Sequence, residues 1–350
     1  MPKSDWRWYA HRDMERTTST PDLTPNPPRP RLEKWIKRLS FIAMIGMFIV
    51  LMMGSTVTNT GSGEGCGRSW PLCHGKFIPE YAVETAIEFS HRIVTAVEGV
   101  LIAAVSIGAI MIRRGNRQVK VLVGVLVFTL LFQSGLGAAA VMWPQSPWVM
   151  ASHFGISMTC FAAIFLLTRY LYEPQSLDGE AANRKTPPPL WFRRGAWAAL
   201  VLSVIVAYIG AYMRHSGNEL GCHTWPLCNG QVFPGFTGSE GVAFAHRFVA
   251  LALMLLMFGL TWWARSFRTD YPQLSFVLNI SSVTIVLQAL AGAFVVESLL
   301  DLWATLLHAA LMAILFVMIC DACRMVWSAR PRPSQQQVTT SQPSPVPAGD

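Results

Sequence analysis

Residues 82–112 read AVETAIEFSHRIVTAVEGVLIAAVSIGAIMI, a long apolar run with a histidine and an arginine, His91 and Arg92, near its start. A helix that spans a bilayer needs roughly 20 apolar residues. This run therefore predicts a transmembrane helix that carries a histidine close to one membrane face. The chain contains eight runs of this kind, at residues 38–58, 82–112, 119–142, 147–172, 192–214, 241–265, 273–297 and 300–327.

The composition agrees with an all-α integral membrane protein. Of the 350 residues, 52% are hydrophobic and only 14% are charged, whereas soluble domains have about 25% charged residues. The net charge of +8 is compatible with nucleic-acid binding, but the basic residues form short clusters between the apolar runs. That distribution is typical of membrane topology and not of a nucleic-acid interface, so we expect membrane lipid and no nucleic acid as a partner.

Lysine and arginine also predict the orientation of the chain. They gather before the first span and in the even-numbered connections, for example at Arg113, Arg114, Arg117, Lys120, Arg184, Lys185, Arg193, Arg194, Arg265 and Arg268. The odd-numbered connections contain only Arg68, Lys76 and Arg214. Because basic loops stay on the cytoplasmic side, we expect a multi-pass protein of a bacterial plasma (inner) membrane with both termini cytoplasmic.

The segments outside the spans are polar and rich in proline. Residues 1–37 are predicted to form a basic, disordered cytoplasmic tail,. Residues 173–190 form a cytoplasmic linker, and residues 328–350 form a second disordered cytoplasmic tail.

The two halves of the chain repeat at an offset of 155 residues. The equivalent positions include Trp70-Pro71-Leu72-Cys73 with Trp225-Pro226-Leu227-Cys228, Gln133 with Gln288, and Gly137 with Gly292. The repeat predicts two tandem four-helix bundles, residues 38–172 and 191–327. Each has an even number of spans, so both have the same orientation and are expected to be related by a pseudo-two-fold axis along the membrane normal.

Four of the eight histidines obey this repeat. His91 and His246 lie near the outward ends of the second and sixth spans, and His153 and His308 near those of the fourth and eighth. One interpretation is an interhelical hydrogen bond. Two histidines on facing helices of each bundle favour axial ligation of heme iron, whereas zinc or copper would lack further ligands.

An arginine follows the first histidine of each pair. Arg92 and Arg247 are candidates for a forked contact with a heme propionate. The alternative is an interfacial arginine that extends to lipid headgroups.

One carboxylate breaks the repeat. Glu88 lies three residues before His91, on the same helical face, but the equivalent position in the second half is Ala243. A carboxyl group close to the membrane interior suits proton transfer. The alternative is a glutamate at the helix end that reaches the interface. The asymmetry predicts that the first unit performs the chemistry and the second holds a cofactor.

The outer connections each contain a cysteine pair, Cys66 with Cys73 and Cys222 with Cys228. Disulfides are permitted on the outer side of a bacterial inner membrane, where each pair could close a lid over its histidine site. A redox-active pair that exchanges electrons and metal binding together with His74 or His223 are the alternatives.

Together these features resemble bacterial heme A synthase, of the type with two outer-loop cysteine pairs. The resemblance rests on Glu88-x-x-His91-Arg92, His153, His246-Arg247, His308, the duplicated unit and the cysteine loops, and it covers about residues 38–327.

The resemblance implies a heme-dependent oxidoreductase that oxidises the C8 methyl group of heme O to a formyl group, giving heme A. It implies that His91 and His153 flank the heme O substrate with Glu88 essential beside them, and that His246 and His308 ligate a resident heme B. It also implies redox involvement of the first cysteine pair, supply by a heme O synthase, delivery to cytochrome oxidase assembly, and an electron donor that the sequence does not identify.

Three other functions account for part of the pattern. A di-heme b-type electron carrier accounts for the histidines but not for Glu88 opposite Ala243. A membrane thiol–disulfide oxidoreductase accounts for the cysteines but not the histidines. A transporter with parallel repeats is disfavoured because few charged residues fall near the predicted midplane.

Overall fold

A computed structural model describes residues 30–76, 82–143, 146–173 and 187–328 of the chain. Its eight long helices are α1 (Pro30–Asn59), α2 (Val83–Ile112), α3 (Arg117–Met142), α4 (Pro147–Tyr172), α6 (Leu190–His215), α7 (Gly238–Ala264), α8 (Pro272–Glu297) and α9 (Leu302–Ser328). Two short 3-10 helices, η2 (Ser62–Glu64) and η3 (Arg265–Phe267), follow α1 and α7. Each long helix is apolar and long enough to cross a membrane, which confirms the predicted all-α membrane fold.

Most helices begin and end within a few residues of the predicted spans, but α1 does not. It begins at Pro30, so residues 30–37 are helical, whereas we had assigned them to the amino-terminal tail. Glu33 explains the extension, because a carboxylate in the first turn stabilises a helix. Its Oε1 atom lies 2.9 Å from Nζ of Lys37 and 2.8 Å from Nη2 of Arg113 at the end of α2. The predicted tails at 1–29 and 329–350 and linker residues 174–186 lie outside the described residues.

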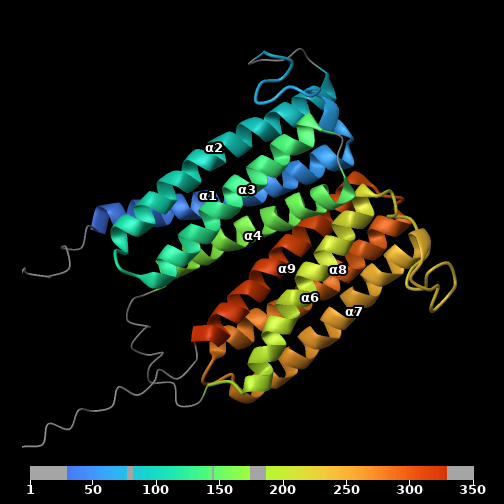
Figure 1. Cartoon of the computed structure of the whole chain (residues 1–350). Coiled ribbons are helices and arrows are strands. Elements are labelled where there is room, and N and C mark those ends of the chain that lie inside the picture. The colour runs from blue at the N-terminus through green and yellow to red at the C-terminus, as the bar shows by residue number, and fades with distance from the viewer. Residues whose placement is uncertain (1–29, 77–81, 144–145, 174–186, 329–350) are drawn as a thin grey trace, which may run out of the picture.

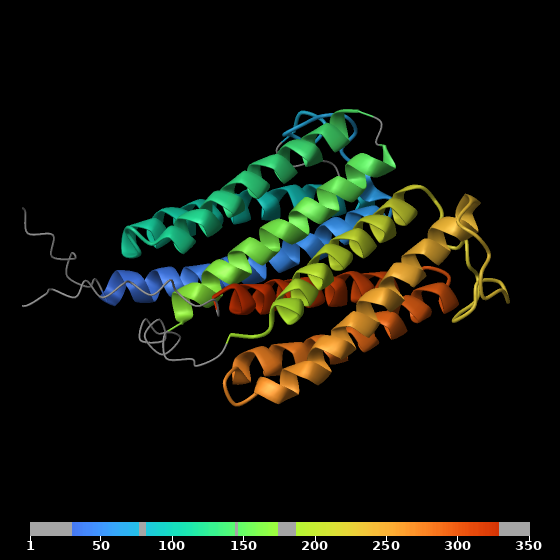
Figure 2. The same cartoon turned by 60° about the horizontal axis from the view of Figure 1, so that its bottom comes forward.

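The same helix pairing occurs in each half of the chain. Helices α1 and α2 pack together, as do α3 and α4, and α6–α9 repeat this arrangement. Figure 1 shows the first unit, in blue to green, beside the second, in yellow to red, with the cysteine loops of both at one end of the molecule. The view turned by 60° shows the same two-part arrangement (Figure 2).

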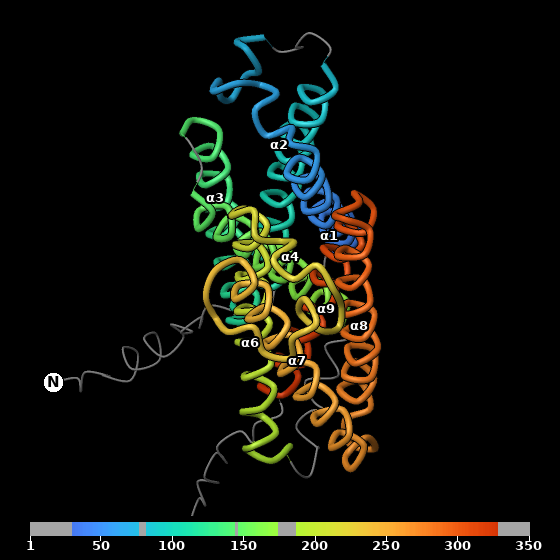
Figure 3. The backbone as a smooth tube through the Cα atoms, turned by 90° about the vertical axis from the view of Figure 1, so that its right-hand side faces the viewer, coloured from blue at the N-terminus to red at the C-terminus, as the bar shows by residue number. Residues whose placement is uncertain are grey.

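The two units meet along α4 and α9, which lie in the middle of the assembly (Figure 3). Helix α4 also packs on α6, and α9 packs on α1. Gly155 makes the first of these contacts close, since a Cβ atom there would overlap the ring of Tyr208. Small residues allow membrane helices to approach in this way. Trp148 stacks on Tyr212 nearby, with ring centroids 4.2 Å apart.

An ion-pair network joins the units at the end opposite the cysteine loops. Arg324 of α9 contacts Glu173 after α4 at 2.8 and 3.1 Å and Asp321 at 2.8 Å. Arg169 of α4 lies 3.4 Å from Asp321, whose side chain is only 4% exposed. Arg169 and Arg324 occupy equivalent positions of the repeat. The network thus ties the equivalent ends of α4 and α9 to one another.

We expect Arg324→Ala to lower the free energy of unfolding by about 3 kcal/mol, because it leaves the buried Asp321 carboxylate without its closest partner. Chemical denaturation in detergent micelles measures this change. Arg268→Ala, at an exposed position beyond η3, is the control. Equal stabilities of the two variants would show that the network does not hold the units together.

Candidate functional site

One cavity of about 1920 Å³ lies in the half of the molecule that carries the cysteine loops. It is lined by residues from all eight helices, most of them apolar, and it extends from one unit into the other. All four repeated histidines face it: His91, His153, His246 and His308. The structure therefore brings the two predicted pairs into a single apolar chamber, and not into two separate pockets.

Each of these histidines rests on a glycine of the helix paired with its own. A Cβ atom on Gly210 would lie 2.9 Å from Cε1 of His246, and one on Gly292 would lie 3.1 Å from Cε1 of His308. In the first unit the corresponding distances are 3.4 Å between Gly54 and His91, and 3.3 Å between Gly137 and His153. Any side chain at these glycines would press on an imidazole ring. The four glycines therefore fix where the rings lie.

Backbone carbonyl groups orient one ring in each pair. Nδ1 of His153 lies 3.1 Å from the carbonyl oxygen of Gln133, and Nδ1 of His246 lies 3.2 Å from that of Val206. A histidine that binds a metal usually donates its other ring N–H to such a group. These bonds leave Nε2 free to face the cavity. Nδ1 of the other ring in each pair, His91 and His308, has no hydrogen-bond partner among the described residues, so each unit holds one ring by a carbonyl group and one without.

The second pair has the spacing that a shared metal requires. The ring centroids of His246 and His308 lie 6.5 Å apart. Two imidazole nitrogens that each bind one metal ion at about 2 Å place their ring centroids about 6 Å apart. The side-chain Nε2 of Gln288 lies 3.2 Å from Nε2 of His308, so Gln288 would have to release this ring nitrogen, which has a single lone pair, for a metal to bind there. By its spacing, the second pair fits an axially ligated heme iron.

Glu88 lies at the top of the cavity beneath the first cysteine loop. Its side chain is buried, and Oε2 accepts a hydrogen bond from the backbone N–H of Cys66 at 2.8 Å. Oε1 pairs with the guanidinium group of Arg92. The carboxylate thus faces the cavity and also anchors the loop that covers it.

The two arginines make contacts that the sequence did not predict. Arg92 donates to the carbonyl oxygen of Ser69 at 2.8 Å, besides pairing with Glu88. Arg247 donates to the carbonyl oxygens of Thr224 and Cys222 at 2.7 and 3.1 Å. Each guanidinium group therefore holds its own outer loop in place while it lines the cavity.

Both cysteine pairs are disulfides, Cys66 with Cys73 and Cys222 with Cys228, which confirms the predicted disulfide pairing. Their residues are almost completely buried. Cysteines in a disulfide are not available as metal ligands, so the alternative in which they bind a metal with His74 or His223 is wrong. Within the described ranges, no group of three or more His, Cys, Asp or Glu side chains is arranged to hold a bare metal ion.

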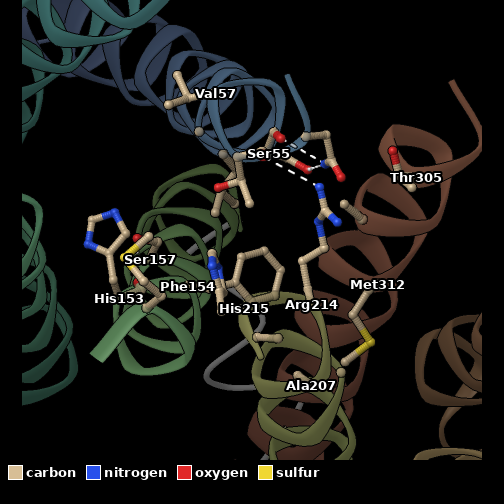
Figure 4. Close-up of a pocket in the computed structure, with 18 of the residues that line it drawn as sticks. Ser55, Val57, His153, Phe154, Ser157, Ala207, Arg214, His215, Thr305 and Met312 are labelled. Carbon is tan, nitrogen blue, oxygen red and sulfur yellow. Dashed lines mark hydrogen bonds between the residues drawn. The ribbon is translucent and has the colours of Figure 1, made fainter. Parts of the chain in front are cut away.

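Helix α6 also contributes to the first unit, which the sequence comparison missed. Figure 4 shows His215 at the end of α6 beside Phe154 of α4, and Arg214 extending toward the end of α1 that carries Ser55. Arg214 pairs with Glu219 and donates to the carbonyl oxygen of Thr58 at 3.4 Å. Arg214 and His215 were invisible to a comparison within the repeat, because they lack equivalents of the same type.

Two of the four glycines were also missed, for a simpler reason. Gly54 and Gly210 are separated by 156 residues, as are Cys66 and Cys222, whereas positions after the cysteine loop are separated by 155. A comparison that allowed one gap in this loop would have paired both glycines.

The chain is similar to proteins of known family. The model of the cytochrome oxidase assembly protein family matches residues 37–320. A heme A synthase of Alkalihalophilus pseudofirmus is 39% identical over 286 residues, which cover 81% of this chain and 95% of that protein. Heme A synthases of Shouchella clausii and Halalkalibacterium halodurans are each 37% identical, over 84% and 83% of this chain and 98% and 96% of their own lengths.

The family match reaches into every transmembrane helix and includes all four repeated histidines. The chain therefore belongs to the cytochrome oxidase assembly protein family, within which its relatives are heme A synthases.

Proposed function

We propose that this protein is a heme A synthase, which oxidises the C8 methyl group of heme O to a formyl group. The observation that carries the proposal is the pair of equivalent histidine sites that face one apolar cavity, in a chain that aligns with heme A synthases over nearly their whole length. One site suits a resident cofactor and the other a substrate of the same chemical class.

We assign a resident heme B to His246 and His308. The fit rests on their 6.5 Å centroid separation, the hydrogen bond of His246 to Val206, and the close contacts with Gly210 and Gly292. The bound heme would supply electron transfer, while the protein provides ligands and an apolar surrounding.

We assign the substrate heme O to His91 and His153. These rings lie on equally placed glycines but with slightly more space. A looser site suits a porphyrin that must enter and leave. The apolar lining suits its isoprenoid chain, because burying apolar groups is favourable.

We propose that Glu88 holds a proton at the substrate site. Its buried carboxylate lies one helical turn from His91 and faces the same cavity. Ala243 replaces it in the second unit, where Arg247 reaches the carbonyl oxygen of Cys222 directly. The second loop is anchored instead through Glu240 of α7, whose carboxylate accepts a hydrogen bond from Asn229 at 2.7 Å and does not line the cavity. Anchoring therefore does not require a carboxylate that faces the cavity, as Glu88 does.

Arg92 and Arg247 remain our candidates for contacts with heme propionates. Both line the cavity, and a guanidinium group has five N–H donors, more than the loop carbonyls require. For the cysteines we favour the structural role, because burial of both disulfides shields them from the thiolate attack that exchange requires. A redox role of the first pair needs its loop to open.

The setting of the enzyme follows from the charge pattern. We propose a bacterial inner-membrane location with both termini cytoplasmic and the disulfide loops outside, as the distribution of lysine and arginine indicates. A heme O synthase would supply the substrate, and assembly of cytochrome oxidase would use the product. The electron acceptor or donor is not identified by the described residues.

Extraction and chromatography of hemes from cells that express this chain with a heme O source test the proposed function. We expect a formyl-heme that is absent from cells with the source alone. If the purified protein contains heme and only unconverted heme O is extracted, the chain is an electron carrier and not a synthase.

Glu88→Gln tests the proton role. Glutamine keeps an oxygen that accepts the hydrogen bond from Cys66, but it does not exchange a proton, so we expect the formyl-heme yield to fall by about 100-fold. Resident heme should be retained. Glu84→Gln, at an exposed position one turn earlier, is the control. Full conversion by Glu88→Gln would leave the carboxylate with an anchoring role only.

Gly210→Val should displace His246 and weaken binding of the resident heme by about 10- to 100-fold, the usual effect of disturbing the support of a metal ligand. The heme absorbance per protein measures this. Gly259→Val is the matched control, because a Cβ atom at Gly259 of α7 meets nothing within 4 Å. Equal heme contents would exclude the glycine contact as a determinant of the site.

A further inference from the structure

A second carboxylic acid lies inside the first unit, deeper in the membrane than Glu88. Glu98 of α2 is two helical turns beyond His91 on the same helical face, and only 3% of the residue is exposed. Its neighbours Gly99 and Ile102 line the cavity. Glu98 thus lies directly behind the cavity wall, near the centre of the four-helix unit.

The structure makes room for this side chain by a glycine. The Glu98 carboxyl group lies against Gly46 of α1, where a Cβ atom would overlap Oε2. Any other residue at position 46 would displace the carboxyl group. Glu98 and Gly46 therefore fit each other as a pair across the contact between α1 and α2.

The second unit replaces both members of this pair. Glu98 is equivalent to Leu253 at the offset of 155 residues, and Gly46 is equivalent to Leu202 at the offset of 156 that relates α1 to α6. Leu253 is 1% exposed, and Leu202 packs against the same hydrophobic core. Two leucines are therefore sufficient for packing at this place, and packing alone does not account for a carboxyl group.

The surroundings of Glu98 do not compensate a negative charge. Oε1 is buried and has no hydrogen-bond partner within the part of the chain that the structure describes. Cys160 of α4 is the titratable group that faces it, and it carries no positive charge. Gly46 on α1 contributes no side chain. An unpaired carboxylate in such a place is very costly, so the neutral acid is the stable form, and ionisable groups inside membranes usually serve ion or proton movement.

We propose that Glu98 and Gly46 form an intramembrane proton-binding site that exchanges a proton with the substrate cavity of the first unit. The acid gives its proton to the cavity when the adjoining site takes up negative charge, and the resulting carboxylate then takes up one of the protons that oxidation of the methyl group releases. No electron passes through the group and no bond to the porphyrin forms. This role rests on the proposed function, because oxidation of a methyl group releases protons as well as electrons.

The test compares the wild-type protein with Glu98→Gln and with the double variant Gly46→Leu/Glu98→Leu, which reproduces the leucine pair of the second unit. Infrared spectroscopy of the purified proteins should show the carbonyl band of a neutral carboxylic acid in the wild type and its loss in both variants. Resident heme per protein should be unchanged. The formyl-heme yield should fall at least about tenfold in both, and Glu98→Asp should restore part of it.

Absence of the carbonyl band from the wild type, or full conversion of heme O by the double variant, would overturn the proposal. Loss of resident heme from both variants would also overturn it, because Glu98 would then be a packing residue. If the wild type produces no formyl-heme, the proposed function fails, while the infrared band still decides whether Glu98 holds a proton.

Discussion

Contact between an imidazole ring and a glycine determines how each helix pair of this protein is spaced. The histidine of one helix lies where the partner helix has no side chain, at Gly54, Gly137, Gly210 and Gly292. This contact brings backbone carbonyls within hydrogen-bond distance of Nδ1 at His153 and His246, and it directs the other ring nitrogen into the cavity. The cavity, the tautomer of the rings and the separation of His246 from His308 all depend on it.

Duplication supplied two such sites, and a few substitutions distinguish them. Glu88 opposite Ala243, and Glu98 with Gly46 opposite Leu253 with Leu202, place both additional carboxyl groups in the first unit. The second unit has the tighter glycine contacts, at Gly210 and Gly292. A reaction site needs acid groups nearby, whereas a cofactor site needs firm support of its ligands. The two units differ in this way.

The outer loops cover both histidine sites at the surface of the protein. In both units a disulfide closes the loop, and an arginine next to the site histidine holds its carbonyl groups. The arginine therefore couples the position of the lid to the helix that carries the ligand. At the opposite end, Arg169 and Arg324 join the units through shared carboxylates. Charged contacts thus hold the loops over the cavity at one end of the molecule and join the two units at the other.

Much of this architecture could be predicted from the sequence, because long apolar runs and widely spaced rare residues leave few alternatives. The eight spans, both cysteine pairings and the histidine pairs were visible in this way. The extension of α1 was not, since it depends on Glu33 contacting Arg113 of another helix. The glycines Gly54 and Gly210 were hidden by a one-residue shift in the repeat. The single cavity and the contacts of Arg214 arise only when the two units pack together.

We propose that the two equivalent histidine pairs hold different hemes, a resident one at His246 and His308 and the substrate at His91 and His153. Electron paramagnetic resonance of the oxidised, purified protein tests it most directly. We expect the low-spin signal of a heme with two imidazole ligands. This signal should persist in His91→Ala and disappear in His246→Ala. A signal that survives in His246→Ala, or that is lost only in His91→Ala, would contradict it.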